Sequence, residues 1–126
     1  MREVILVALG GALGSALRYL ISMYTPLIFG RSYIFTGTLI VNVAGCILIG
    51  VLIQWMEVKQ LMDTGLRLFV LVGFIGGFTT YSTFSLEALE IFRESGSHLI
   101  LYISLHLVLG IGGVWIGIIG SQWLLN

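Results

Sequence analysis

One stretch near the middle of the chain decides the fold, and it reads Gly73-Phe74-Ile75-Gly76-Gly77-Phe78-Thr79-Thr80-Tyr81-Ser82-Thr83-Phe84-Ser85. It begins with an apolar segment, passes through two adjacent glycines, and ends in a run where six of seven side chains carry a hydroxyl. Adjacent glycines weaken a helix because glycine loses the most backbone freedom on folding. The pattern predicts a helix that is broken near Gly76-Gly77.

The composition places this helix in lipid. The chain has 126 residues, of which 58% are hydrophobic and 10% are charged, whereas a soluble globular chain carries about 25% charged residues. Six basic and six acidic residues cancel, which argues against nucleic acid as a partner, since phosphate binding needs a basic excess. The single Cys46 forms no internal disulfide, and no Cys/His cluster has the spacing of a metal site. The length predicts one integral membrane domain over residues 1–126.

Four apolar stretches are long enough to cross a bilayer, which needs about 20 mostly apolar residues. They predict an all-α membrane protein with helices at approximately 4–24, 36–56, 66–94 and 98–124. The first span contains Arg18. The connections are expected around Pro26 and Gly30, from Glu57 to Gly65, and from Ser95 to Ser97.

The basic residues give no clear orientation in the membrane. Four spans place both termini on the same side. Arg2, Lys59 and Arg67 fall on that side, against Arg31, Arg93 and, if it lies at its helix end, Arg18. The positive-inside rule therefore sets no strong orientation. Two interpretations stay open: insertion in both directions, which would permit an antiparallel dimer, or a weak bias that the insertion machinery corrects.

Many of the 17 glycines lie within the predicted helices. Three pairs form G-x-x-x-G motifs, which let transmembrane helices approach closely; they are Gly10 with Gly14, Gly73 with Gly77, and Gly113 with Gly117. Gly76-Gly77 differs because a polar run follows it. Broken backbone is tolerated at membrane depth only where it is buried in protein or lines a wet cavity. Carbonyls freed by such a break can coordinate a cation.

A set of polar residues within the apolar helices carries the functional signal. Intramembrane ionisable residues are functional candidates by default, whereas a single hydroxyl often bonds back to its own helix. Hydroxyls and an amide donate hydrogen bonds to an anion without a fixed charge, which suits a pore that must release its ion. Tyr81 and Phe84 share a helix face, and aromatic rings have a positive edge. The candidates for a small-anion path are Arg18, Asn42 and the run Thr79–Ser85, joined more weakly by Thr38, Glu87 and His106.

Several of these residues also have a purely structural interpretation. Arg18 either snorkels to the interface from the end of its span or attracts anions toward a vestibule. Phe84 taken alone would fill a helix interface. Glu87 faces either the vestibule or a partner. We interpret His106 as a hydrogen-bonded packing residue rather than as a proton relay.

These residues resemble the fluoride channel family called Fluc, also named CrcB. The resemblance covers the full length and rests on three motifs. They are Gly10-Gly11-x-x-Gly14-x-x-x-Arg18-Tyr19, Gly37-Thr38-Leu39-x-x-Asn42-x-x-Gly45, and Gly73-Phe74-x-Gly76-Gly77-Phe78-Thr79-Thr80-Tyr81-Ser82-Thr83-Phe84-Ser85-x-Glu87. The third motif is long and unusual, and it is the strongest of the three.

The resemblance implies a multi-pass channel in the plasma membrane of a prokaryote. It implies a dual-topology antiparallel dimer of four-helix subunits with two pores, and passive export of fluoride with selection against chloride, which gives resistance to fluoride toxicity. It also implies roles for single residues: Phe84 and Tyr81 as pore-lining aromatics, Asn42 as the pore amide, Ser82 and Thr83 in a polar track, Thr38 on the same pathway, and Arg18 at the vestibule. Backbone carbonyls of Gly76 and Thr79 from both subunits would hold a structural sodium ion at the dimer centre.

The sequence departs from the family pattern in two places. The first aromatic of the motif is usually Phe, and here it is Tyr81, whose hydroxyl can hydrogen-bond along the pore or alter conduction. In the fourth helix several members carry a Ser near the pore, whereas this chain has Gly110 to Gly113. Since some organisms have two subunits that work only together, a homodimer and a heterodimer with a paralogous subunit both stay open.

Two other functions are compatible with four short spans. A small proton-coupled multidrug exporter needs a membrane-embedded carboxylate, usually in the first helix. Here that helix contains Arg18 with only Glu3 at its edge, and the deep acid is Glu87. A non-transporting membrane scaffold would use the polar residues for stability alone. No nucleophile–base pair or metal site is visible, so we expect no enzyme.

Overall fold

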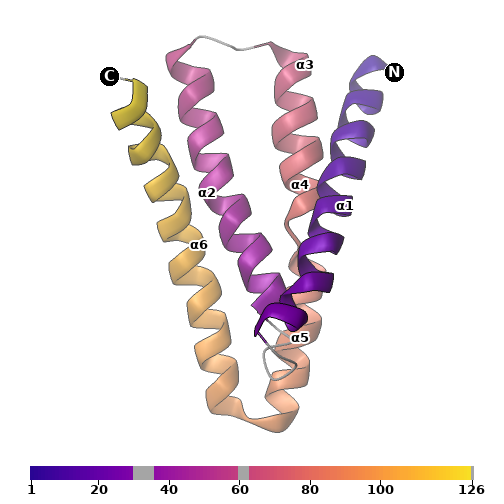
Figure 1. The fold of residues 1–126 in the computed structure, drawn as a ribbon, viewed down its shortest axis with the longest axis vertical. Helices are drawn as coiled ribbons and strands as arrows, with labels where there is room; N and C mark the ends of the chain where they lie inside the picture. The colour runs from indigo at the N-terminus through magenta and orange to yellow at the C-terminus, as the bar shows by residue number, and fades with distance from the viewer. Residues whose placement is uncertain (30–35, 60–62, 126) are drawn as a thin grey trace.

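The computed structural model describes residues 1–29, 36–59 and 63–125 and shows four helical spans, each long and apolar enough to cross a membrane. The prediction of an all-α membrane fold is therefore confirmed. Both termini lie at the same end of the bundle (Figure 1). Three of the spans are single helices: α1 covers Arg2–Phe29, α2 covers Thr36–Val58, and α6 covers Gly96–Leu125.

The third span is built from four pieces. It begins with α3 (Thr64–Arg67), whose N-cap Asp63 accepts a hydrogen bond from the Leu66 N–H at 2.9 Å. A π-helical segment, η2 (Leu68–Ile75), and the short α4 (Gly76–Phe78) follow. After two extended residues the span continues as α5 (Tyr81–Glu94). Ser95 alone then separates α5 from α6.

The third span is broken, as predicted, but the break lies at Thr79-Thr80 rather than at the two glycines. Gly76 has helical dihedral angles of −62° and −35°. Thr79 (φ −82°, ψ 160°) and Thr80 (φ −146°, ψ 123°) are extended. The glycine pair stays helical because Gly77 packs against α1: a Cβ there would lie 2.9 Å from the Gly11 Cα.

The first helix runs further than the sequence suggests. We expected its end near Pro26, yet α1 continues through Pro26 to Phe29. Pro26 removes only one backbone donor, that of the Ser22 carbonyl one turn earlier, and a transmembrane helix tolerates one such loss. In the preceding position the Thr25 hydroxyl bonds to the Ile21 carbonyl at 2.7 Å. Gly30 lies outside the described residues. The longer helix leaves Arg18 well inside α1 rather than at its end.

The four spans pack as two pairs, and glycines lie at the contact within each pair. α6 packs mainly against α2, and α1 packs mainly against η2 and α4. In the first pair, a Cβ on Gly117 would lie 2.9 Å from the Val51 N. In the second, a Cβ on Gly14 would lie 2.8 Å from the Phe78 N. The predicted role of the G-x-x-x-G motifs in close helix approach is confirmed. The two pairs diverge toward the end that holds both termini (Figure 1).

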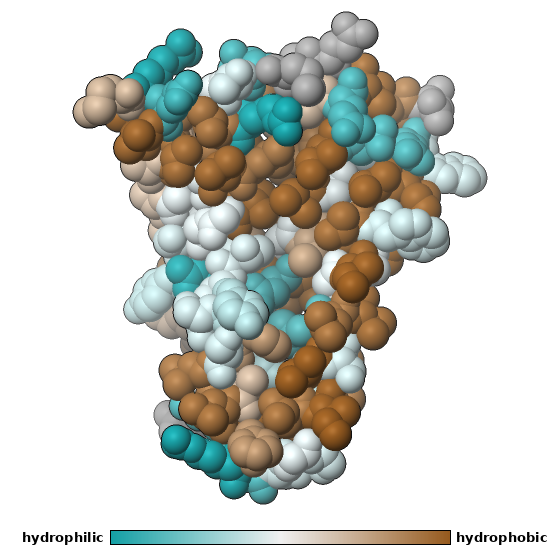
Figure 2. All heavy atoms as spheres, turned by 180° about the vertical axis from the view of Figure 1, so that it is seen from behind, coloured by the Kyte–Doolittle hydropathy of each residue, from teal (hydrophilic) through white to brown (hydrophobic). Residues whose placement is uncertain are grey.

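Apolar residues cover much of the face shown in Figure 2. Hydrophilic residues gather at the two ends of the molecule, and further polar residues lie at mid-height between two apolar bands. Large apolar side chains remain exposed on α1 and α6, for example Leu9 at 55% and Ile111 at 72%. Such a surface fits lipid, or lipid and a partner helix, rather than water.

The glycine contacts predict a position-specific effect of adding one methyl group on α6. Gly117→Ala should lower the free energy of unfolding by about 1–3 kcal/mol, because the new Cβ meets the backbone of α2, which cannot give way. Gly120→Ala, on the same helix, should be neutral or slightly stabilising, because nothing lies within 4 Å of its Cβ position. Thermal unfolding in detergent, followed by circular dichroism, compares the two. Equal melting temperatures would contradict the packing described above.

Candidate functional site

The extended backbone at Thr80 is held by the side chain of Asn42 on α2. The Asn42 Nδ2 donates to the Thr80 carbonyl at 3.1 Å, and the Thr80 N–H donates to the Asn42 Oδ1 at 2.8 Å. One amide thus satisfies both backbone groups of a residue that has left the helix. An asparagine amide has two N–H donors. Among the described residues the second one has no acceptor, so it remains available to a ligand.

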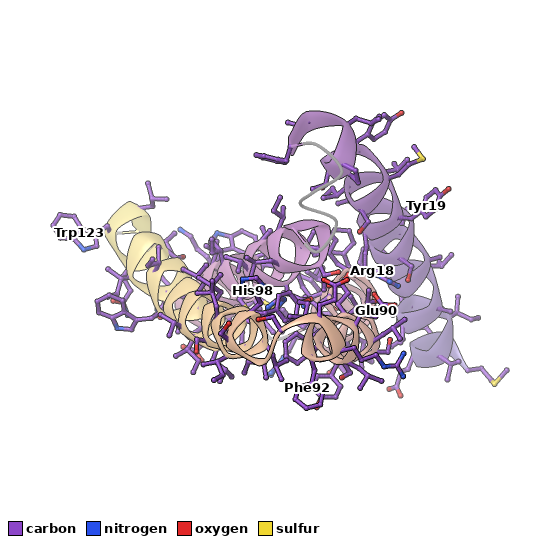
Figure 3. The ribbon with its side chains drawn as sticks, turned by 90° about the horizontal axis from the view of Figure 1, so that it is seen from below. Arg18, Tyr19, Glu90, Phe92, His98 and Trp123 are labelled. Carbon is purple, nitrogen blue, oxygen red and sulfur yellow. The ribbon has the colours of Figure 1, made fainter. Side chains whose placement is uncertain are left out.

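The carbonyl end of the broken helix is held from α1. The Arg18 Nε donates to the Gly77 carbonyl at 3.1 Å, and the Ser15 hydroxyl donates to the same oxygen at 3.4 Å. A cation at the carboxyl end of a helix is electrostatically favourable. Arg18 lies on the side of α1 that faces the third span, whereas Tyr19 points outward (Figure 3). The snorkelling interpretation requires Arg18 to lie at the end of its span. The structure places it within the span instead, so that interpretation is wrong.

The hydroxyl run divides into two groups. Thr80 is the N-cap of α5: its Oγ1 accepts from the Thr83 N–H at 3.2 Å and donates to the Thr83 Oγ1 at 3.0 Å. Thr79 and Ser85 bond back to carbonyls one turn earlier, at 3.0 and 2.9 Å. Ser82 is exposed, and its hydroxyl lies 3.4 Å from the Thr80 Oγ1. Part of the run therefore stabilises the break, and part remains at the surface.

A groove of about 380 Å³ lies beside the break, open on one side of the chain. Its walls come from α2, the third span and α6. Six of the candidate residues line it and provide its polar and aromatic groups: Asn42, Thr79, Thr80, Tyr81, Phe84 and His106. Arg18, Thr38, Ser82 and Thr83 do not line this groove.

Phe84 is the centre of an aromatic cluster. Its ring centroid lies 5.5 Å from that of Tyr102, 4.6 Å from that of His106 and 5.8 Å from that of Tyr81. Phe84 is half-buried, whereas Tyr81 is 80% exposed. The two predicted aromatics share a face, as expected, but Tyr81 is much more exposed than Phe84.

A second polar cluster lies on the α5 side of the same aromatic group. The Thr38 hydroxyl donates to the Glu87 Oε1 at 2.6 Å, and the Tyr102 hydroxyl donates to the Glu87 Oε2. Thr38 is 4% exposed. Both carboxylate oxygens thus accept hydrogen bonds from side chains of neighbouring spans. Tyr102 is not among the residues that the sequence pattern indicates; its position one helical turn before His106 is the signal that could have found it.

The break also frees backbone carbonyls. Because the Thr80 N–H bonds to Asn42 and the Thr83 N–H bonds to Thr80 Oγ1, the carbonyls of Gly76 and Thr79 lose their usual donors four residues on. Carbonyl oxygens are suitable ligands for hard cations. In the part of the chain that the structure describes, no cluster of His, Cys, Asp or Glu could hold a metal ion.

Comparison with known proteins assigns the family. The family model described as "CrcB-like protein, Camphor Resistance (CrcB)" matches residues 5–118. A protein from Azobacteroides pseudotrichonymphae named fluoride-specific ion channel FluC is 34% identical over 124 residues, covering 98% of both chains. FluC proteins of Dehalococcoides mccartyi and Agrobacterium fabrum are 38% and 39% identical, and the matches cover 97% and 94% of each chain. This chain belongs to the CrcB family.

Proposed function

We propose that this chain forms a fluoride channel in the plasma membrane that lets fluoride leave the cell passively. The observation that carries the proposal is the groove beside the break, where the Asn42 amide, the hydroxyl run and the ring of Phe84 meet. The FluC relatives support fluoride as the ion. The protein would act as a channel and not as an enzyme.

The groove offers donors of moderate strength, which a channel needs because the ion must also leave. The second N–H of Asn42 can donate to fluoride in the groove, and the exposed hydroxyl of Ser82 would donate to it on the path outside the groove. The amino end of α5, which begins at Tyr81, carries a partial positive charge. The positive ring edges of Phe84 and Tyr81 add weak attraction without binding the ion tightly. Thr83 would belong to the same polar track.

A passive pathway is sufficient for export. Fluoride enters acidified cells as neutral HF, dissociates inside and is trapped as the anion. A membrane potential of 100 mV, negative inside, drives each outgoing negative charge with about 2.3 kcal/mol. No coupling ion is required. The hydrogen bonds of Glu87 favour this passive mechanism over proton exchange, because both of its carboxylate oxygens already accept from hydroxyl groups.

The pathway would be completed by a second subunit in antiparallel orientation. The groove is open on one side, and Tyr81 is exposed beside it. A single four-helix subunit is too slim to enclose an ion path. The near balance of basic residues at the two ends permits insertion in both directions. The second subunit is either another copy of this chain or a paralogous one.

A structural sodium ion would fit at the centre of this dimer. The carbonyls of Gly76 and Thr79 are freed by the break, and Gly76 is exposed, with nothing within 4 Å of its Cβ position. Two carbonyls from each subunit would provide four oxygen ligands. The positive charge of the bound ion would attract the carbonyl oxygens of both subunits and so hold the two broken helices together.

The groove geometry predicts which side chains fluoride flux depends on. In liposomes that contain only this chain, fluoride efflux should be fast and chloride efflux negligible, as read with ion-selective electrodes. Phe84→Ile should reduce fluoride efflux by about tenfold or more, equivalent to about 1.4 kcal/mol in the barrier. Asn42→Ala should do the same, and it should also lower stability, because Thr80 loses both of its partners.

Phe92→Ile is the matched control for Phe84→Ile. Phe92 is on the same helix, is 60% exposed and lies outside the groove (Figure 3), so its replacement should leave efflux unchanged. An imposed pH gradient without a fluoride gradient should drive no fluoride uptake beyond the HF leak measured in protein-free vesicles. Unchanged efflux in both groove variants would refute the assignment of the pathway, and proton-driven uptake would favour an exporter.

The dual-topology proposal predicts labelling from both sides of the membrane. Ser97 is exposed at the start of α6, so a Ser97→Cys variant in a Cys46→Ser background presents one thiol near the membrane surface. A membrane-impermeant maleimide added to intact cells should label about half of the molecules, because insertion has no preferred direction. Labelling of all or none of the molecules would show a single orientation and exclude the antiparallel homodimer.

The sodium proposal predicts a cation-dependent dimer. Replacing sodium in the buffer by N-methylglucamine should raise the monomer fraction of the purified protein, because four carbonyl oxygens at the interface lose their shared cation. Chemical crosslinking followed by denaturing electrophoresis measures that fraction. Returning sodium, but not tetramethylammonium at the same ionic strength, should restore the dimer. A dimer fraction that does not change with the cation would argue against the site.

A further inference from the structure

His106 is the one ionisable side chain of α6 that lines the groove. Its ring contacts two aromatic rings that also contact each other, with centroid distances of 4.6 Å to Phe84 and 4.4 Å to Tyr102. These contacts agree with our interpretation of His106 as a packing residue. They do not account for its two nitrogen atoms, which have different surroundings.

The Nδ1 atom of His106 lies 3.1 Å from the Tyr102 carbonyl. A carbonyl oxygen can only accept, so this contact is a hydrogen bond only if Nδ1 carries the proton. The contact therefore selects one neutral tautomer, in which Nε2 is an unprotonated acceptor. Nε2 is buried and has no partner among the residues described. With Nδ1 bonded to its own helix, Nε2 is the atom of this ring left for a ligand.

The protonation state of His106 decides what Nε2 offers. In the neutral ring Nε2 presents a lone pair, which repels an anion. In the imidazolium form Nε2 becomes a charged donor, which attracts one. The ionisable groups around it are Glu87 and Tyr81 on α5, Tyr102 on α6, and Cys46 on α2. Of these, Glu87 is the one carboxyl group, and two hydroxyls donate to its oxygens.

We propose that His106 is a proton-dependent anion-binding residue of the pathway, whose Nε2 donates to fluoride in the groove only when the ring is protonated. This inference rests on the fluoride pathway proposed above. Protonation turns Nε2 from an acceptor into a charged donor, so conduction increases as the pH falls. A channel with this residue conducts best under the acid conditions that load a cell with HF.

Fluoride efflux from liposomes at matched internal and external pH tests this inference, with the HF leak of protein-free vesicles subtracted. Efflux should be about threefold or more faster near pH 5.5 than near pH 8. His106→Gln, which keeps a polar side chain but does not titrate, should remove this dependence. His98→Gln is the matched control, since the only other histidine is exposed at the start of α6 (Figure 3). A pH dependence that survives in His106→Gln, or is absent from the unmodified chain, overturns the proposal.

A second readout separates this proposal from the channel function itself. In the His98→Gln protein, labelled with 15N-histidine in detergent, the Nε2 resonance reports His106 alone. At constant pH near neutrality, fluoride should raise the imidazolium fraction of His106, because the bound anion stabilises the charged ring, and chloride at equal concentration should not. If the chain does not conduct but fluoride still raises the imidazolium fraction of His106, the channel proposal is wrong and His106 remains an anion-binding residue. No response to fluoride refutes the role of His106.

Discussion

A backbone that leaves its helix inside a membrane must find new hydrogen-bond partners, and this constraint organises the rest of the structure. At Thr80 both backbone groups bond to Asn42 of α2, and the Gly77 carbonyl accepts from Arg18 of α1. An unsatisfied group in hydrocarbon costs several kcal/mol. The break is therefore stable only where two other spans meet it.

The glycines make these bonds geometrically possible. Arg18 reaches the Gly77 carbonyl because α1 lies almost in backbone contact with α4, with Gly14 facing Phe78 and Gly11 facing Gly77. A Cβ on Gly45 would overlap the Thr79 side chain, so α2 needs a glycine to come close to the break from the other side. The small residues therefore do more than join helices: they bring two polar side chains to one interruption of the backbone.

The sequence was sufficient for the fold class because length and apolarity alone define four spans. It was not sufficient for the position of the break, since a glycine pair weakens a helix but also permits close packing, and at Gly77 packing prevails. The bond from Arg18 to Gly77 joins residues 59 positions apart, and no local pattern contains it. At the site, the hydroxyl run and Asn42 stood out because they are polar in lipid. Tyr102 did not, because a single tyrosine in an apolar helix is unremarkable until its partner Glu87 is seen.

The hydrogen bonds of Glu87 explain how a carboxylate can lie beside the proposed anion path. A carboxylate facing the groove would repel fluoride, but Thr38 and Tyr102 donate to both Glu87 oxygens. Phe84 and His106, which lie in the same aromatic cluster as Tyr102, line the groove, whereas Glu87 does not. Tyr102 belongs to both clusters, bonding Glu87 through its hydroxyl and His106 through its carbonyl. A change at Tyr102 would therefore disturb the carboxylate and the imidazole together, which makes this residue the link between the two polar clusters.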